Sequence, residues 1–318
     1  MKYFVTGGAG FIGSNLVERL LKNGHEVIAF DNFSTGFKEF TKNAMEFSSY
    51  ELIIGDILNF EKLAQSIDGC DFVFHLAANA DVRYGLSHPK KDLEQNTIGT
   101  FNVLEAMRLK NISNIAFSST GSVYGECEIF PTPENAPFPI QTSLYAASKL
   151  AGEALISSYC EGFEIKSWIF RFVSILGERY THGHVFDFYK SLTDNSEKLQ
   201  VLGDGTQQKS YLYIQDCIDA MLLGIEKTSE RVNIINLGYP DYIKLKDSVS
   251  TICKHLDVRP ELVFSGGKRG WVGDNPFIFL DTQKLNTLGW RPDYDIEDGI
   301  IKTIEWLKEN EWVYKTRK

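Results

Sequence analysis

The chain has 318 residues, of which 43% are hydrophobic and 24% are charged, proportions that exclude a disordered chain and fit a folded globular protein. Acidic residues outnumber basic ones by 42 to 33, giving a formal net charge of −9. No basic stripe is present, so the sequence predicts no nucleic-acid partner. The five cysteines are far apart and lack metal spacing, which predicts reduced thiols in a cytosolic compartment: Cys70, Cys127, Cys160, Cys217 and Cys253.

The N-terminus and the hydropathy pattern bear on location. The first residues run directly into a glycine loop at Gly7, which leaves no room for a signal peptide. No apolar run reaches the roughly 18 residues that a membrane span needs. We therefore expect a soluble, cytoplasmic protein without a membrane partner.

The first 120 residues alternate short apolar runs with longer helical patterns. Five runs are β-branched or aromatic and apolar on both faces, as in a buried parallel sheet. The predicted strands are Tyr3–Thr6, Val27–Phe30, Leu52–Ile54, Phe72–Leu76 and Ile115–Ser118, and the predicted helices between them are Phe11–Lys22, Glu61–Ile67 and Asp92–Lys110. This alternation predicts an α/β fold, a Rossmann-type doubly wound parallel sheet.

The rest of the chain is less regular. Pro131, Pro133, Pro137 and Pro139 indicate a loop, and a helix over Leu144–Tyr159 and a strand over Ser167–Phe172 are expected after it. Shorter elements follow from Ser174. We predict an NAD-binding Rossmann domain over residues 1–173, to which a strand and helix near 207–237 return. A smaller C-terminal α/β domain over residues 174–318 would bind the substrate.

A glycine motif, GxxGxxG, stands between the first predicted strand and the first helix. Gly7 permits a tight turn, Gly10 lets backbone amides approach a pyrophosphate, and Gly13 lets the helix pack closely on the sheet. Asp31 ends the second strand about twenty residues later, where an acid accepts hydrogen bonds from ribose hydroxyls. No Arg or Lys follows before Lys38, which favours NAD over NADP.

Polar residues also end the third and fourth strands. Asp56 can accept from an adenine amino group or cap the following turn, and its position at a strand end favours binding. His75 is either a cofactor neighbour or a packed core histidine, and the sequence leaves both open. Small residues after it, Ala77 and Ala78, leave room for a cofactor.

The pattern Tyr-x-x-x-Lys occurs three times, at Tyr145/Lys149, Tyr242/Lys246 and Tyr314/Lys318. Side chains at i and i+4 lie on one helix face. Lys149 would lower the pKa of the Tyr145 phenol and hold the nicotinamide ribose, and Tyr145 would act as general base for an alcohol. The other two pairs are expected to be incidental, one after a turn and one in a frayed C-terminal tail.

Hydroxyl side chains follow the fifth strand at Ser118, Ser119 and Thr120. Ligands of open α/β sheets lie outside the carboxyl ends of the strands, so a hydroxyl here can bond to the reacting oxygen. An ordinary Ser/Thr turn is the alternative interpretation.

Together these motifs resemble the extended short-chain dehydrogenase/reductase family, specifically its NAD-dependent sugar-nucleotide epimerase/dehydratase group of the UDP-glucose 4-epimerase type. The matching segments cover nearly the whole chain: GGAGFIG at 7–13, GDI at 55–57, HLAA at 75–78, NTIGT at 96–100, SSTGSVYGE at 118–126, YAASK at 145–149 and RFVSILGER at 171–179. The resemblance implies tightly held NAD and a C-terminal domain that binds a nucleoside diphosphate sugar.

The resemblance also implies the site residues. The catalytic set would be Thr120, Tyr145 and Lys149. The cofactor set would be Gly7, Gly10, Phe11, Ile12, Gly13, Asp31, Asn32, Asp56, Ile57, Leu76, Ala77, Ala78, Asn96, Ser118, Tyr145, Lys149 and Phe172. The substrate set would be Asp81, Thr120, Ser122, Ser174, Lys209, Arg269 and Asp274.

Two residues within the resemblance bear on the reaction. In related 4,6-dehydratases the positions after this Thr carry acids, which elimination of water requires, whereas here they are Gly121 and Ser122. A C4 epimerase is therefore favoured over a dehydratase. A net 4-dehydrogenase or 4-ketoreductase and a non-catalytic NAD-binding sensor are the alternatives, although retention of Tyr145, Lys149 and Thr120 argues against the sensor.

Other positions depart from the family pattern. Ser174 stands where many such epimerases have Asn, and Lys209 replaces an Arg, which removes a bidentate fork. Arg269 and Asp274 resemble a late segment of the family with longer spacing. Solvated surface charge is the alternative for Lys209 and Arg269, but an anionic diphosphate needs cations.

The sequence also bears on metal binding and on the oligomeric state. No metal is expected, because His182 and His184 lack a neighbouring third ligand. A homodimer is expected from apolar residues beyond one face of two helices, and complete burial within one chain is the alternative. These residues are Phe101, Val103, Leu104, Met107, Leu150, Leu155, Ile156 and Tyr159.

Overall fold

The structure is a computed structural model that describes residues 1–138 and 140–316. Two residues named above, Pro139 and Lys318, lie outside the described residues. The chain forms two compact units. The first comprises Met1–Val123, Ser143–Arg171 and Met221–Ile235, and the second comprises Tyr124–Thr142, Phe172–Ala220 and Asn236–Lys318. Residues 124–142, which were predicted to belong to the first domain, belong to the second unit. The segment that returns to the first unit is Met221–Ile235, which is shorter than the predicted 207–237.

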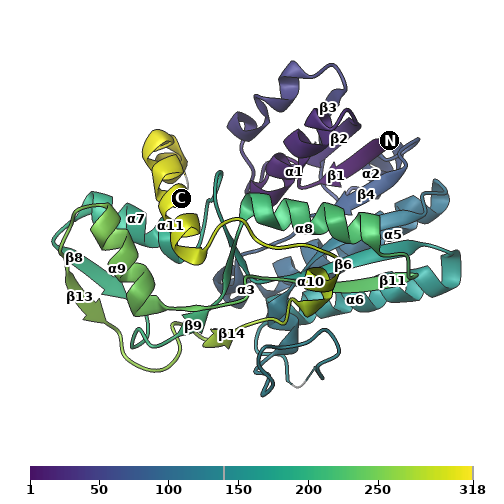
Figure 1. Cartoon of the computed structure of the whole chain (residues 1–318). Helices are drawn as coiled ribbons and strands as arrows, with labels where there is room; N and C mark the ends of the chain where they lie inside the picture. The colour runs from purple at the N-terminus through teal and green to yellow at the C-terminus, as the bar shows by residue number, and fades with distance from the viewer. Residues whose placement is uncertain (139, 317–318) are drawn as a thin grey trace. The chain divides into compact units, whose positions relative to one another are not determined.

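A seven-stranded parallel sheet forms the centre of the first unit (Figure 1), with the strand order β11-β6-β5-β4-β1-β2-β3. Val5 pairs with Ala29 on one side and with Phe74 on the other. The strands are β1 (Lys2–Thr6), β2 (Glu26–Asp31), β3 (Tyr50–Ile54), β4 (Phe72–His75), β5 (Asn114–Thr120), β6 (Lys166–Phe172) and β11 (Val232–Leu237). The predicted Rossmann-type α/β fold is confirmed.

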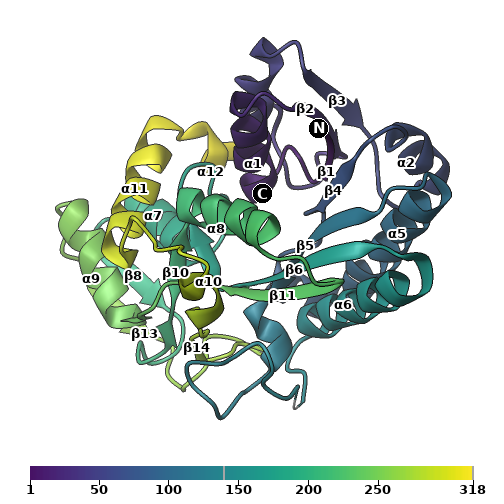
Figure 2. The ribbon, with the colours of Figure 1, turned by 45° about the vertical axis from the view of Figure 1, so that its right-hand side comes forward.

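Helices cover both faces of this sheet (Figure 2), with α1 on one face and α2, α5 and α6 on the other. The helices are α1 (Phe11–Lys22), α2 (Phe60–Ser66), α3 (Val82–Ser87), α4 (Pro89–Lys91), α5 (Gly99–Leu109) and α6 (Leu144–Phe163). The π-helix η3 (Asp92–Ile98) precedes α5, so the predicted helix 92–110 contains two helix types. Short 3₁₀ helices are η1 (Lys38–Thr41), η2 (Ala44–Glu46) and η4 (Gly121–Tyr124).

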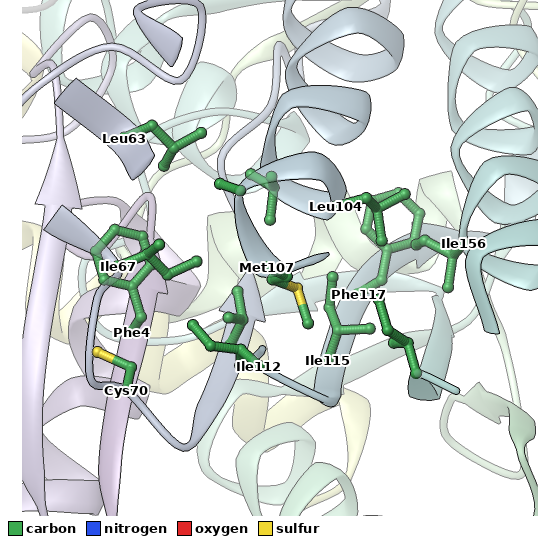
Figure 3. Close-up of a cluster of buried hydrophobic side chains, with 14 of the residues drawn as sticks. Phe4, Leu63, Ile67, Cys70, Leu104, Met107, Ile112, Ile115, Phe117 and Ile156 are labelled. Atoms are coloured by element: carbon green, nitrogen blue, oxygen red, sulfur yellow. The ribbon is translucent and has the colours of Figure 1, made fainter. Parts of the chain in front are cut away.

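The core of the first unit lies between the sheet and the helices α2, α5 and α6 (Figure 3). Phe4, Ile115 and Phe117 contribute from the strands, while Met107 and Ile156 contribute from the helices, all of them fully buried. Fully burying side chains of this size stabilises the fold by about 1.5–3 kcal/mol each. The core therefore holds the carboxyl ends of β1, β4 and β5 in fixed register.

The second unit contains three small sheets, with strand orders β10-β7, β12-β9-β14 and β13-β8. Its strands are β7 (Ser174–Leu176), β8 (Lys198–Val201), β9 (Gln208–Lys209), β10 (Tyr211–Tyr213), β12 (Ile243–Lys244), β13 (Glu261–Phe264) and β14 (Phe277–Ile278). Its helices are α7 (His184–Asp194), α9 (Leu245–His255), α10 (Gln283–Thr287), α11 (Ile296–Glu309) and α12 (Trp312–Thr316). The helix α8 (Ile214–Lys227) passes from the second unit to the first.

The C-terminal segment corrects one expectation. Tyr314 does not lie in a frayed tail: it belongs to α12 and is 6% exposed. Its ring packs edge-on against Tyr189, with centroids 5.8 Å apart. Burial of this aromatic pair orders the segment, since such contacts stabilise beyond the area they bury.

Two further predictions concern the chain as a whole. Across residues 1–138 and 140–316, no helix has the length and apolar character to cross a membrane. All five cysteines are free, as predicted.

Candidate active site

The turn between β1 and α1 requires glycine for steric reasons. Gly7 has φ +70°, and a Cβ atom there would lie 2.8 Å from the backbone nitrogen of Ala77. A Cβ at Gly13 would lie 2.0 Å from the carbonyl oxygen of Gly7. Gly10 is the N-cap of α1 and has no side chain to occupy the helix end. The backbone thus forms a cradle that side chains would fill, which fits a pyrophosphate at a helix N-terminus.

Asp31, at the end of β2, supports this turn. Its Oδ2 accepts a hydrogen bond from Ala9 N (2.9 Å) and its Oδ1 accepts one from Phe33 N (2.7 Å). Burial raises the pKa of the carboxyl group, while the two backbone hydrogen bonds oppose that rise. Each carboxylate oxygen has a further lone pair, so Asp31 can brace the glycine turn and still accept from a ribose.

Asp56 is held by its own loop. Its Oδ1 accepts from Leu58 N (2.9 Å) and its Oδ2 accepts from Asn32 Nδ2 (2.9 Å). The N-cap of α2 is Asn59, whose side chain accepts from Lys62 N. Asp56 therefore orders a turn before that cap, and its bond to Asn32 joins the ends of β2 and β3, where both residues were predicted to bind the cofactor.

His75 proves to be a core histidine. It is fully buried, with Nδ1 2.8 Å from Thr6 Oγ1 and Nε2 3.0 Å from Thr100 Oγ1. Burial lowers its pKa to about 3, with the charge of Lys149 adding to the shift, so the imidazole is neutral. The same Thr6 hydroxyl accepts from the backbone nitrogen of Ala77 (3.2 Å). His75 therefore fixes the strand ends that line the candidate cofactor site.

Tyr145 lies at the start of α6, where the Ser143 hydroxyl caps the helix by accepting from Ala146 N (3.1 Å). Burial raises the pKa of the phenol to about 12, and a hydrogen bond from Thr120 opposes the rise. Thr120 Oγ1 also accepts from Ser122 N (3.1 Å). Two of the three predicted catalytic residues are thus in direct contact.

Lys149 follows one turn later and is 2% exposed. Its Nζ donates to the carbonyl oxygen of Ser118 (2.7 Å) and lies 4.7 Å from the centroid of the Phe117 ring. Burial lowers its pKa to about 7. Burial outweighs the lowering that Lys149 was predicted to exert on the pKa of Tyr145, so the net pKa of the phenol is raised in this structure.

Asn96, on the π-helix η3, connects the loop after β4 with helix α6. Its Oδ1 accepts from Asn79 N (2.8 Å), and its Nδ2 donates to Ser148 Oγ (2.9 Å). Asn79 and Ser148 were not predicted from the sequence as residues of this site. The position of Ser148 directly before Lys149 was the available signal, since a residue there lies beside the base on α6.

The remaining predicted cofactor residues of the first unit lie at element ends. Phe11 and Ile12 open α1, Ile57 follows β3 in the same loop as Asp56, and Leu76 and Ala78 follow β4. Ile57 is buried, whereas Leu76 and Ala78 are partly exposed. These residues follow strand ends or open a helix, the positions at which ligands of open α/β sheets are expected to bind.

Asp81, a predicted substrate residue of the first unit, caps α3. Its Oδ1 accepts from Arg83 N (3.0 Å) and Tyr84 N (3.2 Å). The other, Ser122, lies in η4 directly after Thr120 and is partly buried.

Within the second unit, Lys209 and Asp274 contact each other. Lys209 Nζ is 2.7 Å from Asp274 Oδ1 and 4.9 Å from the centroid of the Trp271 ring. Asp274 is 2% exposed, and its Oδ2 accepts from Gly270 N (2.9 Å). Solvated surface charge, the alternative for Lys209, is thus wrong, because its ammonium neutralises a buried carboxylate.

Arg269 differs from Lys209 in exposure. Its guanidinium forms an ion pair with Glu126, and both side chains are about half exposed, at 47% and 50%.

Ser174 is exposed at the first position of β7. Phe172, a predicted cofactor residue, is largely buried at the end of β6. His184, which raised the question of a metal, has its Nε2 2.7 Å from Ser248 Oγ.

Comparison with known proteins adds a family context. The model of the "NAD dependent epimerase/dehydratase family" matches residues 3–238. A protein of Methanocaldococcus jannaschii, provisionally named as a UDP-glucose 4-epimerase, is 33% identical over 96% of this chain and 98% of its own length. The crystal structure of a UDP-galactose 4-epimerase has a TM-score of 0.88 and 35% identity, covering 98% of this chain and 100% of that one. A dTDP-glucose 4,6-dehydratase double mutant from Streptomyces venezuelae, with NAD bound, has the same fold (TM-score 0.92, 24% identity, full coverage of both chains).

Proposed function

This chain belongs to the NAD-dependent epimerase/dehydratase family, and we propose that it inverts C4 of a nucleoside diphosphate sugar through a transient 4-keto intermediate. The resemblance predicted from the sequence is confirmed, as is NAD as the cofactor. The fold alone does not select the reaction, because an epimerase and a dehydratase both match it across the whole chain. The residues that surround the base must therefore carry the choice.

The observation that carries the proposal is the contact between Thr120 and Tyr145, followed in the chain by two residues that are not acids. Thr120 hydrogen-bonds the phenol, and the next two residues in η4 are Gly121 and Ser122. Elimination of water across C5 and C6 needs a general acid next to this hydroxyl, and neither residue supplies one. Oxidation and reduction at one alcohol carbon need only the phenol and the hydroxyl that are present.

The chain's residues would act on the proton of the C4 hydroxyl. Oxidation of this alcohol releases the proton at O4, and the phenolate oxygen of Tyr145 would accept it. The Thr120 hydroxyl would donate to O4 and hold it in place. In the return step Tyr145 gives the proton back to O4 after the sugar has turned its other face, so Tyr145 ends each cycle in the protonation state in which it began.

The buried Lys149 would provide positive charge next to this proton transfer. Its ammonium favours the phenolate over the phenol, and the bond to the Ser118 carbonyl fixes its position (2.7 Å). NAD, when bound, supplies the hydride acceptor for the oxidation and the hydride donor for the return. Gly7, Gly10 and Asp31 would hold its pyrophosphate and adenosine ribose.

The proposed substrate contacts are the residues that the family resemblance implies. Asp81, Thr120 and Ser122 are the proposed contacts of the first unit, and Ser174, Lys209, Arg269 and Asp274 those of the second. Arg269 is the cation of this set that remains half exposed, which makes it the better partner for a diphosphate. We further propose that the two units correspond to the NAD-binding and nucleotide-sugar-binding domains.

A homodimer fits the apolar surface of the first unit. Val103, Leu104, Met107 and Ile156 are fully buried within the chain, so they do not need a partner. Phe101 on α5 is 43% exposed. Other exposed apolar side chains lie on α5, on η3 and on α6: Leu93, Ile98, Leu109, Leu144 and Phe163. We propose that a second copy covers them, while the cytoplasmic location stays a prediction.

An assay with a panel of UDP-, GDP-, CDP- and dTDP-sugars tests the activity. The expected result is inversion at C4, detected by NMR of the product, without net change in NAD. Stoichiometric reduction or oxidation of NAD would instead indicate the 4-dehydrogenase or 4-ketoreductase. A 4-keto-6-deoxy product would indicate a dehydratase, and binding of NAD without turnover on any sugar would indicate the sensor.

A further inference from the structure

A buried ion pair lies one helical turn beyond Lys149 on α6, between two side chains that the proposed function does not use. Arg171 on β6 donates to Glu153 on α6 through two bonds, Nη2 to Oε2 (2.6 Å) and Nε to Oε1 (3.0 Å). The two side chains are only 1% and 6% exposed. Burying such a pair costs as much free energy as it returns, so stability alone does not explain why it is here.

Glu153 is connected to the same strand end as Lys149. The Ser119 hydroxyl donates to Glu153 Oε1, and the Ser118 carbonyl accepts from Lys149 Nζ (2.7 Å). Lys149 and Glu153 are i and i+4 on α6 and therefore lie on one helix face. Two opposite charges on adjacent turns are thus attached to consecutive residues of β5, directly before Thr120.

Several elements place ionisable or charged groups around Lys149. They are Tyr145 and Glu153 on α6, Asp92 on η3, His75 on β4 and Arg171 on β6. Glu153 acts most strongly in favour of the ammonium, and Asp92 acts in the same direction, while burial opposes both. The ring of Phe117 under Nζ adds a cation–π contact.

Of the two acids, Glu153 is the one whose two oxygens both accept from a guanidinium. An arginine guanidinium keeps its proton at any pH at which the fold survives, and its bidentate partner is therefore a carboxylate. The carboxyl group of Asp92 has its pKa raised by burial, and only its Oδ1 has a hydrogen-bond partner in the structure. His75 is neutral and does not compete.

We propose that Glu153 is a positioning residue for the base, whose fixed carboxylate keeps Lys149 charged while Arg171 and Ser119 hold that carboxylate in place. The step in which the ammonium assists Tyr145 rests on the proposed function. The electrostatic coupling between Glu153 and Lys149 does not.

The first test is the pH dependence of kcat in Glu153→Gln, which keeps the shape of the side chain and removes its charge. The alkaline limb of the profile reports the essential protonated group in the enzyme–substrate complex. In this variant we expect the limb to move to lower pH by about one unit, because an adjacent opposite charge shifts a pKa by this order. An unshifted limb would overturn the proposal.

A matched control is available on the same helix. Glu161 also pairs with an arginine, Arg231, but the two side chains are 80% and 56% exposed. Glu161→Gln is expected to leave both kcat and the alkaline limb unchanged. Equal shifts in the two variants would show a general loss of charge instead of a specific coupling, and would also overturn the proposal.

A second readout does not need activity. The pKa of Lys149 is about 7 in the folded chain and 10.5 when unperturbed. The unfolded chain therefore binds more protons between these values, and the free energy of unfolding gains a contribution that rises with pH through this range. In Glu153→Gln this rise should begin about one pH unit lower, whereas Lys149→Met should lack it.

The two readouts separate the two proposals. A shifted onset of the rise in a protein that turns over no sugar would refute the proposed function and support the role of Glu153. An active enzyme in which neither the limb nor the onset moves would refute the role of Glu153 alone. If Glu153→Gln does not fold, Glu153→Asp is the second variant, because it keeps a carboxylate for the ion pair but places it one methylene group further from Lys149. An unshifted alkaline limb in that variant would overturn the proposal.

Discussion

The end of β5 and the loops around Lys209 in the second unit use charge in different ways. In the first region, Lys149 is buried and donates to a backbone carbonyl, so its charge is available to a neighbour. In the second, Lys209 forms an ion pair with the buried Asp274 (2.7 Å). The difference teaches that the sequence alone does not show whether a predicted cation bonds to a backbone carbonyl or pairs with a buried carboxylate.

The largest effect is expected from Tyr145→Phe, which removes the group that exchanges the proton. We expect kcat to fall by about 10³- to 10⁴-fold, because general acid–base catalysis contributes this order. NAD binding, measured by calorimetry, should be retained, since the ring remains in place. Turnover near the wild-type rate would show that Tyr145 is not the base. The end of β5 would then not differ from the loops around Lys209 by serving catalysis.

Lys149→Met tests whether a buried ammonium with a depressed pKa is kept for function at the expense of stability. We expect kcat to fall by about 100-fold, while the protein becomes more stable than the wild type near and below pH 7. The pKa of Lys149 is depressed to about 7, so the wild type regains stability as pH rises towards 10.5, and the difference should shrink over that range. Urea denaturation at several pH values measures it, and a difference independent of pH would contradict the depressed pKa.

Asp274→Asn examines the compensated pair. It leaves the Lys209 ammonium, whose side chain is 19% exposed, without its carboxylate, and we expect a loss of about 1–3 kcal/mol in the free energy of unfolding. Combining it with Lys209→Met should restore part of the loss, because no charge is then left unpaired. Additive losses in the double variant would mean that the two side chains do not act as a pair.

The smallest effect on stability is expected from Arg269→Ala, since exposed ion pairs contribute about 0–1 kcal/mol. If Arg269 binds the diphosphate, KM should rise about tenfold while kcat changes little. Glu126→Ala is the control, because it frees the guanidinium and should leave KM unchanged or lower it. A KM unaffected by Arg269→Ala would remove this residue from the substrate set.

Local patterns made much of the first unit predictable. The helix Phe11–Lys22 and the strand runs have the predicted type because their periodicity depends on neighbours in sequence. The Tyr145/Lys149 pair has the predicted spacing for the same reason. The pKa of Tyr145 was not predictable, because burial by distant segments decides it.

Contacts between distant segments account for the rest. Lys209 and Asp274 are 65 residues apart, and nothing in their local sequence indicates that they pair. His75 was undecided because its two threonine partners come from β1 and α5. The burial of Tyr314 depends on a ring of α7, Tyr189, so a terminal position alone gave the wrong expectation.

Three consecutive residues at the end of β5 each bond to a different part of α6. Ser118 uses its carbonyl for Lys149, Ser119 its hydroxyl for Glu153, and Thr120 its hydroxyl for Tyr145. Because a shift of one residue along a strand turns every side chain to the opposite face, an insertion here would break all three bonds at once. Insertions that adapt this scaffold to new substrates are therefore expected downstream of residue 120, where the chain has left the strand.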